Sequence, residues 1–123
     1  MVQLHKKLAV KIRLEAQRRF GRDIRLFERS TGLLMSPKSG AMVKPFQDGQ
    51  ADLYGWLRVD GIARHVEIEI KVGKDKLRPE QLAWKNTCED SGVTYFLIHV
   101  PATENIDDAV KRTMDAIERV RRL

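Results

Sequence analysis

Three charged residues alternate with apolar ones in the stretch VEIEIK, which covers residues 66–71. Successive side chains of a β-strand point to opposite faces of a sheet, so Glu67, Glu69 and Lys71 share one face. Carboxylates bind hard divalent cations such as Mg²⁺, and an ammonium beside them can stabilise the charge of a phosphate. The stretch is therefore suited to metal-dependent phosphate chemistry. A strand with one face open to solvent is the alternative, since such a face also carries charges.

A second acid, Asp52, is predicted to lie beside this row. The pair Asp60-Gly61 is a strong hairpin signal, and it separates strands predicted over residues 51–59 and 63–72. Facing residues of this antiparallel pair have numbers that sum to about 121, which places Asp52 opposite Glu69. Two carboxylates at one end of a sheet repel each other unless a cation lies between them. The arrangement predicts a site for Mg²⁺ or Mn²⁺.

Two polar residues on predicted helices could join this site. Glu15 falls within the apolar stripe of the first helix, where a carboxylate requires a partner. A buried ion pair with a basic residue within one turn (Lys11, Arg18 or Arg19) is the alternative. Gln81 lies in the first turn of the second helix, on its inward face, and could orient a metal ligand or a water molecule. An ordinary hydrogen bond in the core is the alternative for this amide.

The elements that must position these residues follow from hydrophobic periodicity and turn signals. Helices are predicted over residues 2–20, 79–91 and 106–123. Strands are predicted over 24–29, 51–59, 63–72 and 93–100, the last a nearly continuous apolar run expected to be covered on both faces. Residues 30–50 are predicted to form a loop or loose hairpin. The order αβββαβα predicts one α/β domain over residues 1–123, with a mixed β-sheet flanked by helices.

Basic residues outnumber acidic ones, 23 to 17, and the excess lies at the two ends of the chain. Residues 1–25 carry eight basic and two acidic side chains. The segment from residue 111 onward carries five basic and two acidic side chains. A basic rim around a slightly acidic centre suits a polyanion held over a metal site, although net charge can also simply maintain solubility. The sequence contains no zinc-finger or recognition-helix pattern, so DNA contacts are predicted to involve phosphates rather than bases.

Composition disfavours other classes of site. Cys88 is the only cysteine, which argues against a disulfide framework and a Cys-rich zinc site. The three histidines, His5, His65 and His99, are scattered without the spacing of a histidine-metal nuclease. Charges interrupt every apolar run near the N-terminus, so neither a signal peptide nor a membrane span is expected. We therefore expect a cytoplasmic protein.

The chain resembles the VRR-NUC family of PD-(D/E)XK nucleases, in the stand-alone form of phages and bacteria. Asp52 followed by Glu69-Ile70-Lys71 matches the D…ExK signature, with Ala51 where a proline often stands. Further matches in order and spacing are ERSTG (28–32), Ser39-Gly40, GQADLYG (49–55), KLRPEQ (76–81) and SGVTYFLI (91–98). The resemblance covers nearly the whole chain and implies a restriction-endonuclease-like αβββαβα core.

The resemblance implies roles at the strand positions that match. Asp52, Glu69 and the backbone carbonyl of Ile70 would bind Mg²⁺ or Mn²⁺. Lys71 would position or polarise the attacking water and would neutralise charge on the scissile phosphate. Two neighbouring carboxylates favour the charged form of Lys71 unless it is strongly desolvated, so we expect an electrostatic role for it rather than that of a general base.

Further roles are implied for helix and loop positions. Gln81 matches the catalytic-site glutamine of the second helix, and Glu15 corresponds to the first-helix acid, which would bind the metal through water or hold a second cation. Residues assigned to DNA contacts are Arg29, which matches a family position, and the basic residues Lys74, Lys76 and Arg78.

Two positions depart from the family pattern. Arg78 stands where Ser or Thr commonly precedes the proline, which removes a helix N-cap but adds a cation near the substrate. Glu67 is an additional acid on the catalytic face, where it could support the metal ligands or repel DNA. Neither position belongs to the predicted metal ligands.

The predicted function is that of a divalent-metal-dependent DNA endonuclease. The stand-alone relatives suggest a homodimer that selects branched DNA such as four-way junctions, and a symmetric dimer would present two active sites to opposite strands. A nucleic-acid-binding module without turnover is the first alternative. An interaction domain with a solvated charged strand is the second.

Overall fold

The computed structural model describes residues 2–29, 34–43 and 48–122. Its main sheet has four strands in the order β1-β4-β5-β6: β1 (Ile24–Glu28), β4 (Leu53–Val59), β5 (Ile62–Val72) and β6 (Thr94–Val100). β4 is antiparallel to β1 and β5, whereas β5 and β6 run parallel. The helices are α1 (Val2–Phe20), α2 (Pro79–Asp90) and α3 (Ile106–Arg121), and the 3-10 helix η1 (Gly21–Asp23) links α1 to β1. The predicted α/β class with a mixed sheet and three helices is therefore confirmed.

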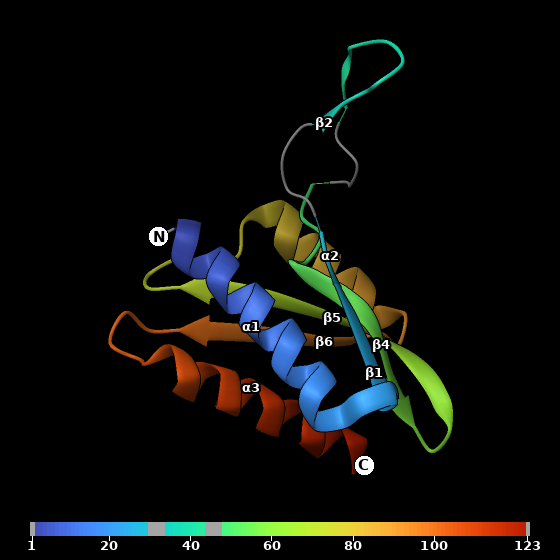
Figure 1. The fold of residues 1–123 in the computed structure, drawn as a ribbon, viewed down its shortest axis with the longest axis vertical. Coiled ribbons are helices and arrows are strands. Elements are labelled where there is room, and N and C mark those ends of the chain that lie inside the picture. Colours follow the sequence, from blue (N-terminus) through green and yellow to red (C-terminus); the bar gives the residue numbers. More distant parts are fainter. Residues whose placement is uncertain (1, 30–33, 44–47, 123) are drawn as a thin grey trace.

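Helices cover the two faces of the sheet unequally (Figure 1). α1 and α3 lie side by side on one face, and the hydrophobic core fills the space between them and the sheet. α2 lies on the other face. Amphipathic spacing explains this arrangement, since the buried residues of α1 recur at steps of three or four. The core includes Leu8, Ile12, Leu53, Leu57, Ile68, Ile70, Met114 and Ile117.

The hairpin between β4 and β5 has the predicted register. Asp60 and Gly61 adopt positive φ angles of 52° and 78°, as a tight two-residue turn of type I′ requires. Leu53 pairs with Ile68 at the far end of the hairpin. The register therefore brings the start of β4 beside the acids of β5.

β5 is enclosed on both faces over residues 66–72. Its apolar residues belong to the core, while the alternate residues Glu67, Glu69 and Lys71 are only 0%, 2% and 5% exposed. The solvated-face alternative is therefore wrong. Because burying a charge costs several kcal/mol unless it is compensated, each of these three ions requires a partner.

β6 is fully covered on one face and only partly covered on the other, where Tyr95 is half-buried. Phe96, Ile98 and Val100 are buried in the core, but Leu97 is 42% exposed and His99 is also exposed. The prediction that both faces of this strand are covered is wrong. An open pocket lies beside Leu97 and His99, where α2 leaves the sheet uncovered.

The segment predicted as a loop or loose hairpin contains a short hairpin. β2 (Leu34–Met35) and β3 (Met42–Val43) pair antiparallel as a separate two-stranded sheet. Of the matching run ERSTG (28–32), residues 30–32 lie outside the described part of the chain. Among the helices that the structure describes, none combines the length and hydrophobicity needed to cross a membrane.

Candidate functional site

The pairing of β4 with β5 ends next to Asp52, so the backbone of Ile70 has no partner in β4. The ladder between the two strands ends at Leu53 and Ile68. Beyond this point the Asp52 side chain takes the place of a backbone acceptor, because its Oδ2 accepts the N–H of Ile70 at 2.7 Å. The carbonyl oxygen of Ile70 is contacted by His5 Nε2 at 3.0 Å. A carboxylate and a backbone carbonyl, both hard oxygen donors, therefore meet at this edge.

Glu69 is the least satisfied ion of the site. Its Oε2 accepts a hydrogen bond from Gln81 Nε2 at 3.3 Å and lies 3.5 Å from Lys71 Nζ. Its Oε1 is buried without a hydrogen-bond partner among the residues described. Burial, and next the charge of Asp52, raise the pKa of Glu69 to about 7, although the charges of Lys71 and His5 act in the opposite direction. A cation beside this oxygen would offset the cost of burying the Glu69 charge and the repulsion between Glu69 and Asp52.

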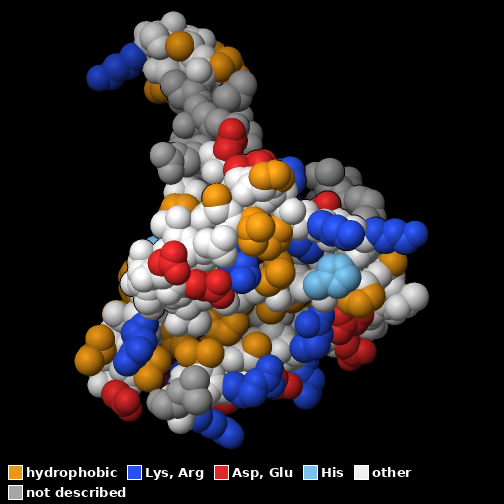
Figure 2. Space-filling view, turned by 180° about the vertical axis from the view of Figure 1, so that it is seen from behind, with side chains coloured by type: hydrophobic (Ala, Val, Ile, Leu, Met, Phe, Trp, Pro, Cys, Tyr) orange, Lys and Arg blue, Asp and Glu red, His pale blue; other side chains and the backbone are white. Residues whose placement is uncertain are grey.

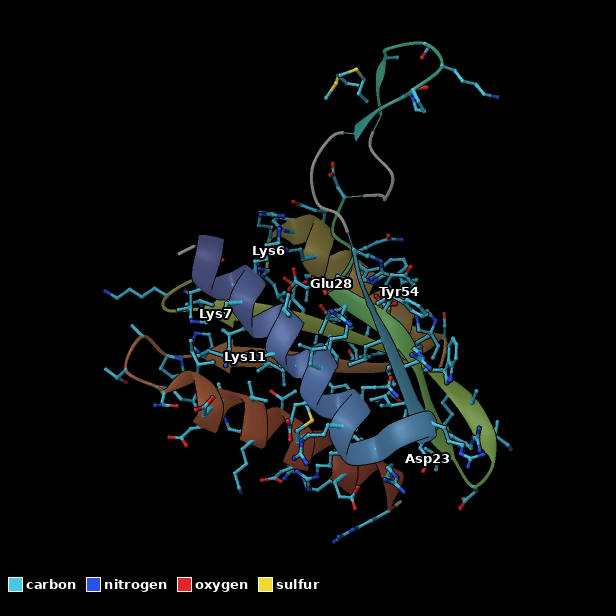
Figure 3. The ribbon with its side chains drawn as sticks, in the orientation of Figure 1. Lys6, Lys7, Lys11, Asp23, Glu28 and Tyr54 are labelled. Carbon is cyan, nitrogen blue, oxygen red and sulfur yellow. The ribbon has the colours of Figure 1, made fainter. Side chains whose placement is uncertain are left out.

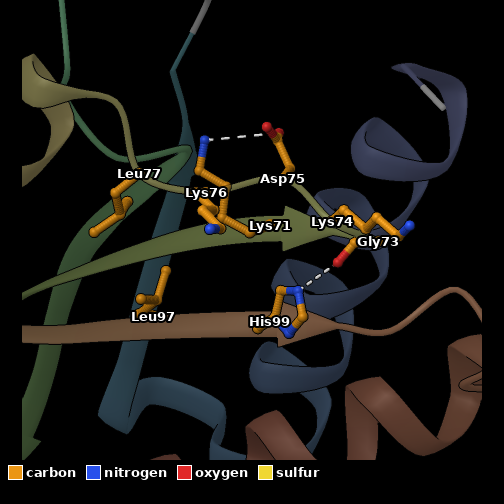
Figure 4. A pocket seen from close by; sticks show the side chains of 8 residues that line it. All are labelled: Lys71, Gly73, Lys74, Asp75, Lys76, Leu77, Leu97 and His99. Atoms are coloured by element: carbon orange, nitrogen blue, oxygen red, sulfur yellow. Dashed lines mark hydrogen bonds and ion pairs between the residues drawn. The ribbon is translucent and has the colours of Figure 1, made fainter.

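Lys71 connects the buried acids to an open pocket. Its ammonium lies 3.5 Å from Glu69 Oε2 and 3.8 Å from Asp75 Oδ2. The pocket beside it has a volume of about 670 Å³ and combines the apolar side chains of Leu77 and Leu97 with basic ones (Figure 4). An anionic group that enters this pocket would meet the ammonium of Lys71 at its inner wall.

Gln81 links the start of α2 to the acids. Its Oε1 accepts the N–H of the N-cap residue Arg78 at 2.9 Å, which is the bond that the third helical residue makes in a capping box. Its Nε2 donates to Glu69, so the predicted inward position of Gln81 is confirmed. Gly49 packs directly against this turn, and any larger residue there would clash, because its Cβ atom would collide with the carbonyl oxygen of Glu80.

Replacing Gly49 with alanine is expected to displace the first turn of α2 and loosen the contact between Gln81 and Glu69. The matched control is Gly61→Ala, since both glycines have positive φ, 90° and 78°, but Gly61 has nothing within 4 Å of the added Cβ. We expect Gly49→Ala to cost about 2 kcal/mol more unfolding free energy than Gly61→Ala, measured by chemical denaturation. Equal losses would contradict this account of Gly49.

Glu15 does not belong to the site, and its predicted role as the first-helix acid is wrong. Its carboxylate accepts hydrogen bonds from Arg18, including one at 3.0 Å. The alternative is therefore right about the ion pair and its partner but wrong about burial, since the pair lies at the surface. These hydrogen bonds lower the pKa of Glu15. Ten residues separate Glu15 from His5, or about 15 Å along a helix that rises 1.5 Å per residue, so the carboxylate cannot reach Asp52.

Arg29 and Glu67 form a buried ion pair rather than a DNA contact. The Arg29 side chain is 7% exposed, and its guanidinium binds both oxygens of Glu67, at 2.5 and 2.9 Å. Trp84 Nε1 also donates to Glu67, at 2.9 Å. Burial raises the pKa of Glu67, but hydrogen bonds from Arg29 and Trp84 outweigh it and leave the pKa lowered. The prediction of Arg29 as a DNA-binding residue is therefore wrong, and Glu67 is too enclosed to repel DNA.

His5 is the site residue that sequence reasoning missed. Its Nε2 lies 3.1 Å from Asp52 Oδ2 and 3.0 Å from the carbonyl oxygen of Ile70. The hydrogen bond with Asp52 raises the pKa of His5, although partial burial opposes the shift. The first helix therefore does reach the acids, but through its N-terminal turn.

Helical geometry contained the signal for His5. At 100° per residue, His5 lies about 100° around α1 from Leu4, and the buried Ile12 and Ala16 lie at about 80° and 120°. His5 is thus at the centre of the buried stripe, whereas Glu15, at about 20°, is at its edge. Glu15 therefore lies beside the buried stripe and is only half-buried.

Basic side chains flank the acids on two sides. Lys74, Lys76 and Arg78 are exposed along the segment between β5 and α2, and Arg78 forms a surface pair with Glu80. Lys6 and Lys7 are exposed on the N-terminal half of α1 (Figure 3). The side opposite to Figure 1 shows Lys and Arg side chains around hydrophobic ones and a histidine (Figure 2). Such exposed cations suit phosphate contacts.

Within the described residues, no three side chains of His, Cys, Asp or Glu are grouped so as to hold a metal ion by themselves. A cation at this edge would therefore depend on the Ile70 carbonyl beside the carboxylates. Comparisons of the chain with models of known protein families, with curated proteins and with solved structures find no match. The VRR-NUC resemblance stays a prediction from the motifs.

Proposed function

We propose that the chain is a divalent-metal-dependent endonuclease that hydrolyses phosphodiester bonds of DNA. One observation carries the proposal: Glu69 is buried beside Asp52, with Oε1 lacking a hydrogen-bond partner among the described residues and its pKa raised to about 7. A carboxylate in such an environment destabilises the metal-free fold, and strongly perturbed acids of this kind concentrate at functional sites.

The residues at this edge fit a hard divalent cation. Asp52, Glu69 and the carbonyl of Ile70 would hold Mg²⁺ or Mn²⁺ through oxygen, the donor type that such ions prefer. When bound, the cation makes water nucleophilic near neutral pH and offsets negative charge on the phosphate. The Oε1 of Glu69 supports this assignment, because it is a buried carboxylate oxygen to which no group in the described part of the chain donates a hydrogen bond.

The protein's own groups would orient the reaction. Gln81 holds Oε2 of Glu69, which leaves Oε1 available, and the N–H of Ile70 holds Asp52 Oδ2. Lys71 places a buried positive charge between the acids and the pocket, where it would stabilise charge developing on the scissile phosphate. Lys74 and Lys76 would contact neighbouring phosphates of the same strand.

The proposal extends to substrate and assembly. Phosphate contacts from lysines do not read sequence, so shape would have to select the substrate, and branched DNA such as a four-way junction is the shape that the family resemblance implies. A homodimer would present two such sites to opposite strands.

A cleavage panel tests this function. Four-way, flap, nicked and linear DNA are incubated with the protein in Mg²⁺ or Mn²⁺, with EDTA as the control. We expect metal-dependent cutting with a preference for the four-way or flap substrate. Equal cutting of all four would contradict shape selection but not the nuclease. Binding without cutting of any substrate, in either metal, would favour the non-catalytic binding module instead.

A further inference from the structure

Three potential donor atoms meet where β4 and β5 separate, and one is an imidazole nitrogen. Nε2 of His5 lies 3.1 Å from Asp52 Oδ2 and 3.0 Å from the Ile70 carbonyl oxygen. In an octahedral site with bonds of about 2.1 Å, neighbouring donors are separated by √2 times that length, or about 3 Å. The two distances from His5 therefore match those between adjacent ligands of one cation.

We infer that His5 is a direct ligand of the divalent cation, and this inference rests on the metal site of the proposed function. Both oxygens near Nε2 can only accept hydrogen bonds, so in the metal-free protein the hydrogen on Nε2 satisfies them. A cation at this point would bind the neutral ring through Nε2, with the ring's one hydrogen on Nδ1. The imidazolium would release its Nε2 proton to solvent, and the neutral ring would exchange its Nε2 hydrogen for one on Nδ1. His5 Nε2, Asp52 Oδ2 and the Ile70 carbonyl oxygen would thus share a hydrogen in the metal-free protein and bind the cation in the metal-bound one.

The completed donor set would have four members. Asp52, the Ile70 carbonyl and His5 already converge. Among the described residues, Glu69 does not form a metal-holding group with His5 and Asp52 in the metal-free protein, so its unpartnered Oε1 would join them only when the cation binds. Four protein donors leave two positions of an octahedron for water and a phosphate oxygen. The position of His5 is also set by the fold, because it occupies the centre of the buried stripe that fixes α1 against the sheet.

A nitrogen ligand changes which metals the site prefers. Mg²⁺ and Ca²⁺ favour oxygen donors, whereas imidazole strengthens binding of later first-row ions such as Co²⁺. A site of carboxylates and carbonyl alone would gain little from exchanging Mg²⁺ for Co²⁺. Dependence of Co²⁺ affinity on His5 is therefore the consequence that separates a ligand from a histidine that only hydrogen-bonds Asp52.

Calorimetric titration of the full, tag-free chain with Co²⁺ and with Mg²⁺ tests the inference. The proteins compared are wild type, His5→Gln and the control His99→Gln, whose imidazole bonds the carbonyl of Gly73 instead. We expect His5→Gln to weaken Co²⁺ binding by about tenfold or more, to change Mg²⁺ binding by about threefold at most, and His99→Gln to match wild type.

A spectroscopic measurement on the wild type removes any dependence on how the variant folds. Electron spin-echo spectra of Mn²⁺ bound to protein with ¹⁵N-labelled histidine should show coupling to one imidazole nitrogen. Metal binding that is equal in wild type and His5→Gln, without nitrogen coupling, would overturn the role of His5 and leave the proposed function standing. Failure of the wild type to bind any of these cations would overturn both.

Discussion

Replacing Lys71 with methionine is expected to slow metal-dependent DNA cleavage by about a thousandfold while changing DNA affinity by less than about threefold. Methionine keeps an apolar stem of similar length in a position that is only 5% exposed, so the fold should persist. The ammonium that it removes lies 3.5 Å from Glu69 and faces the pocket. Single-turnover cleavage and equilibrium binding to the same oligonucleotide measure the two effects separately.

Lys74→Met is the matched control for this prediction. Lys74 is exposed beside the same pocket, so its loss should weaken binding and reduce the salt dependence by about one phosphate contact. Its cleavage rate at saturating protein should stay close to that of the wild type. If Lys71→Met instead lost binding and kept most of its single-turnover rate, Lys71 would be a phosphate contact and its proposed catalytic role would be wrong.

Glu69→Gln and Glu67→Gln are expected to change stability in opposite directions, although the two acids share one face of β5. At pH 8 without metal, Glu69→Gln should stabilise the protein by about 2 kcal/mol, because it removes a buried charge whose pKa is raised to about 7. Glu67→Gln should destabilise it by about 3 kcal/mol, because it removes the negative charge that Glu67 places against the buried guanidinium of Arg29.

The pH dependence of the first effect has a definite sign. The folded-state pKa of Glu69 lies above its value of 4.5 in the unfolded chain, so folded wild type holds this proton more tightly. This group therefore contributes stability below pH 4.5, and the contribution is lost as the pH rises through about 7. The advantage of Glu69→Gln should accordingly be small at pH 4.5 and full at pH 8.

Chemical denaturation in EDTA at both pH values measures these differences. A saturating divalent cation should reverse the order, since the wild type gains binding energy that Glu69→Gln lacks. A Glu69→Gln protein less stable than wild type at pH 8 without metal would contradict the view that this acid is uncompensated.

The central part of the site could be predicted because local rules determine it. The Asp60-Gly61 turn sets the register, and the register alone places Asp52 near Glu69. Gln81 follows from the helix start at Pro79, since position and periodicity fix its direction. Each of these inferences uses residues that are neighbours in one strand pair or one helix.

The partners of the charged residues could not be predicted in the same way. Alternation places Glu67 and Glu69 on one face of β5. The packing of α2 and of the end of β1 then pairs Glu67 with Arg29 and Trp84. Glu69 lies beside Asp52 instead. Two acids with the same local pattern therefore have opposite pKa shifts. That difference arises from tertiary contacts between distant segments.

The extent of cover over a strand is also a tertiary property. The apolar run of β6 predicted burial on both faces, yet Leu97 and His99 line the pocket beside Lys71. Hydrophobicity of one strand does not reveal where the facing helix ends. The pocket, through which the proposed function would admit its substrate, could for this reason not be predicted from the sequence.

Diffraction from crystals soaked in Mn²⁺ tests the central claim most directly, because the anomalous signal locates the ion without reference to activity. The account predicts one peak per chain within about 2.5 Å of carboxylate oxygens from both Asp52 and Glu69 and of the Ile70 carbonyl oxygen. No peak at this edge under saturating Mn²⁺, or a peak that only one of the two carboxylates reaches, would contradict a shared metal site and with it the proposed nuclease.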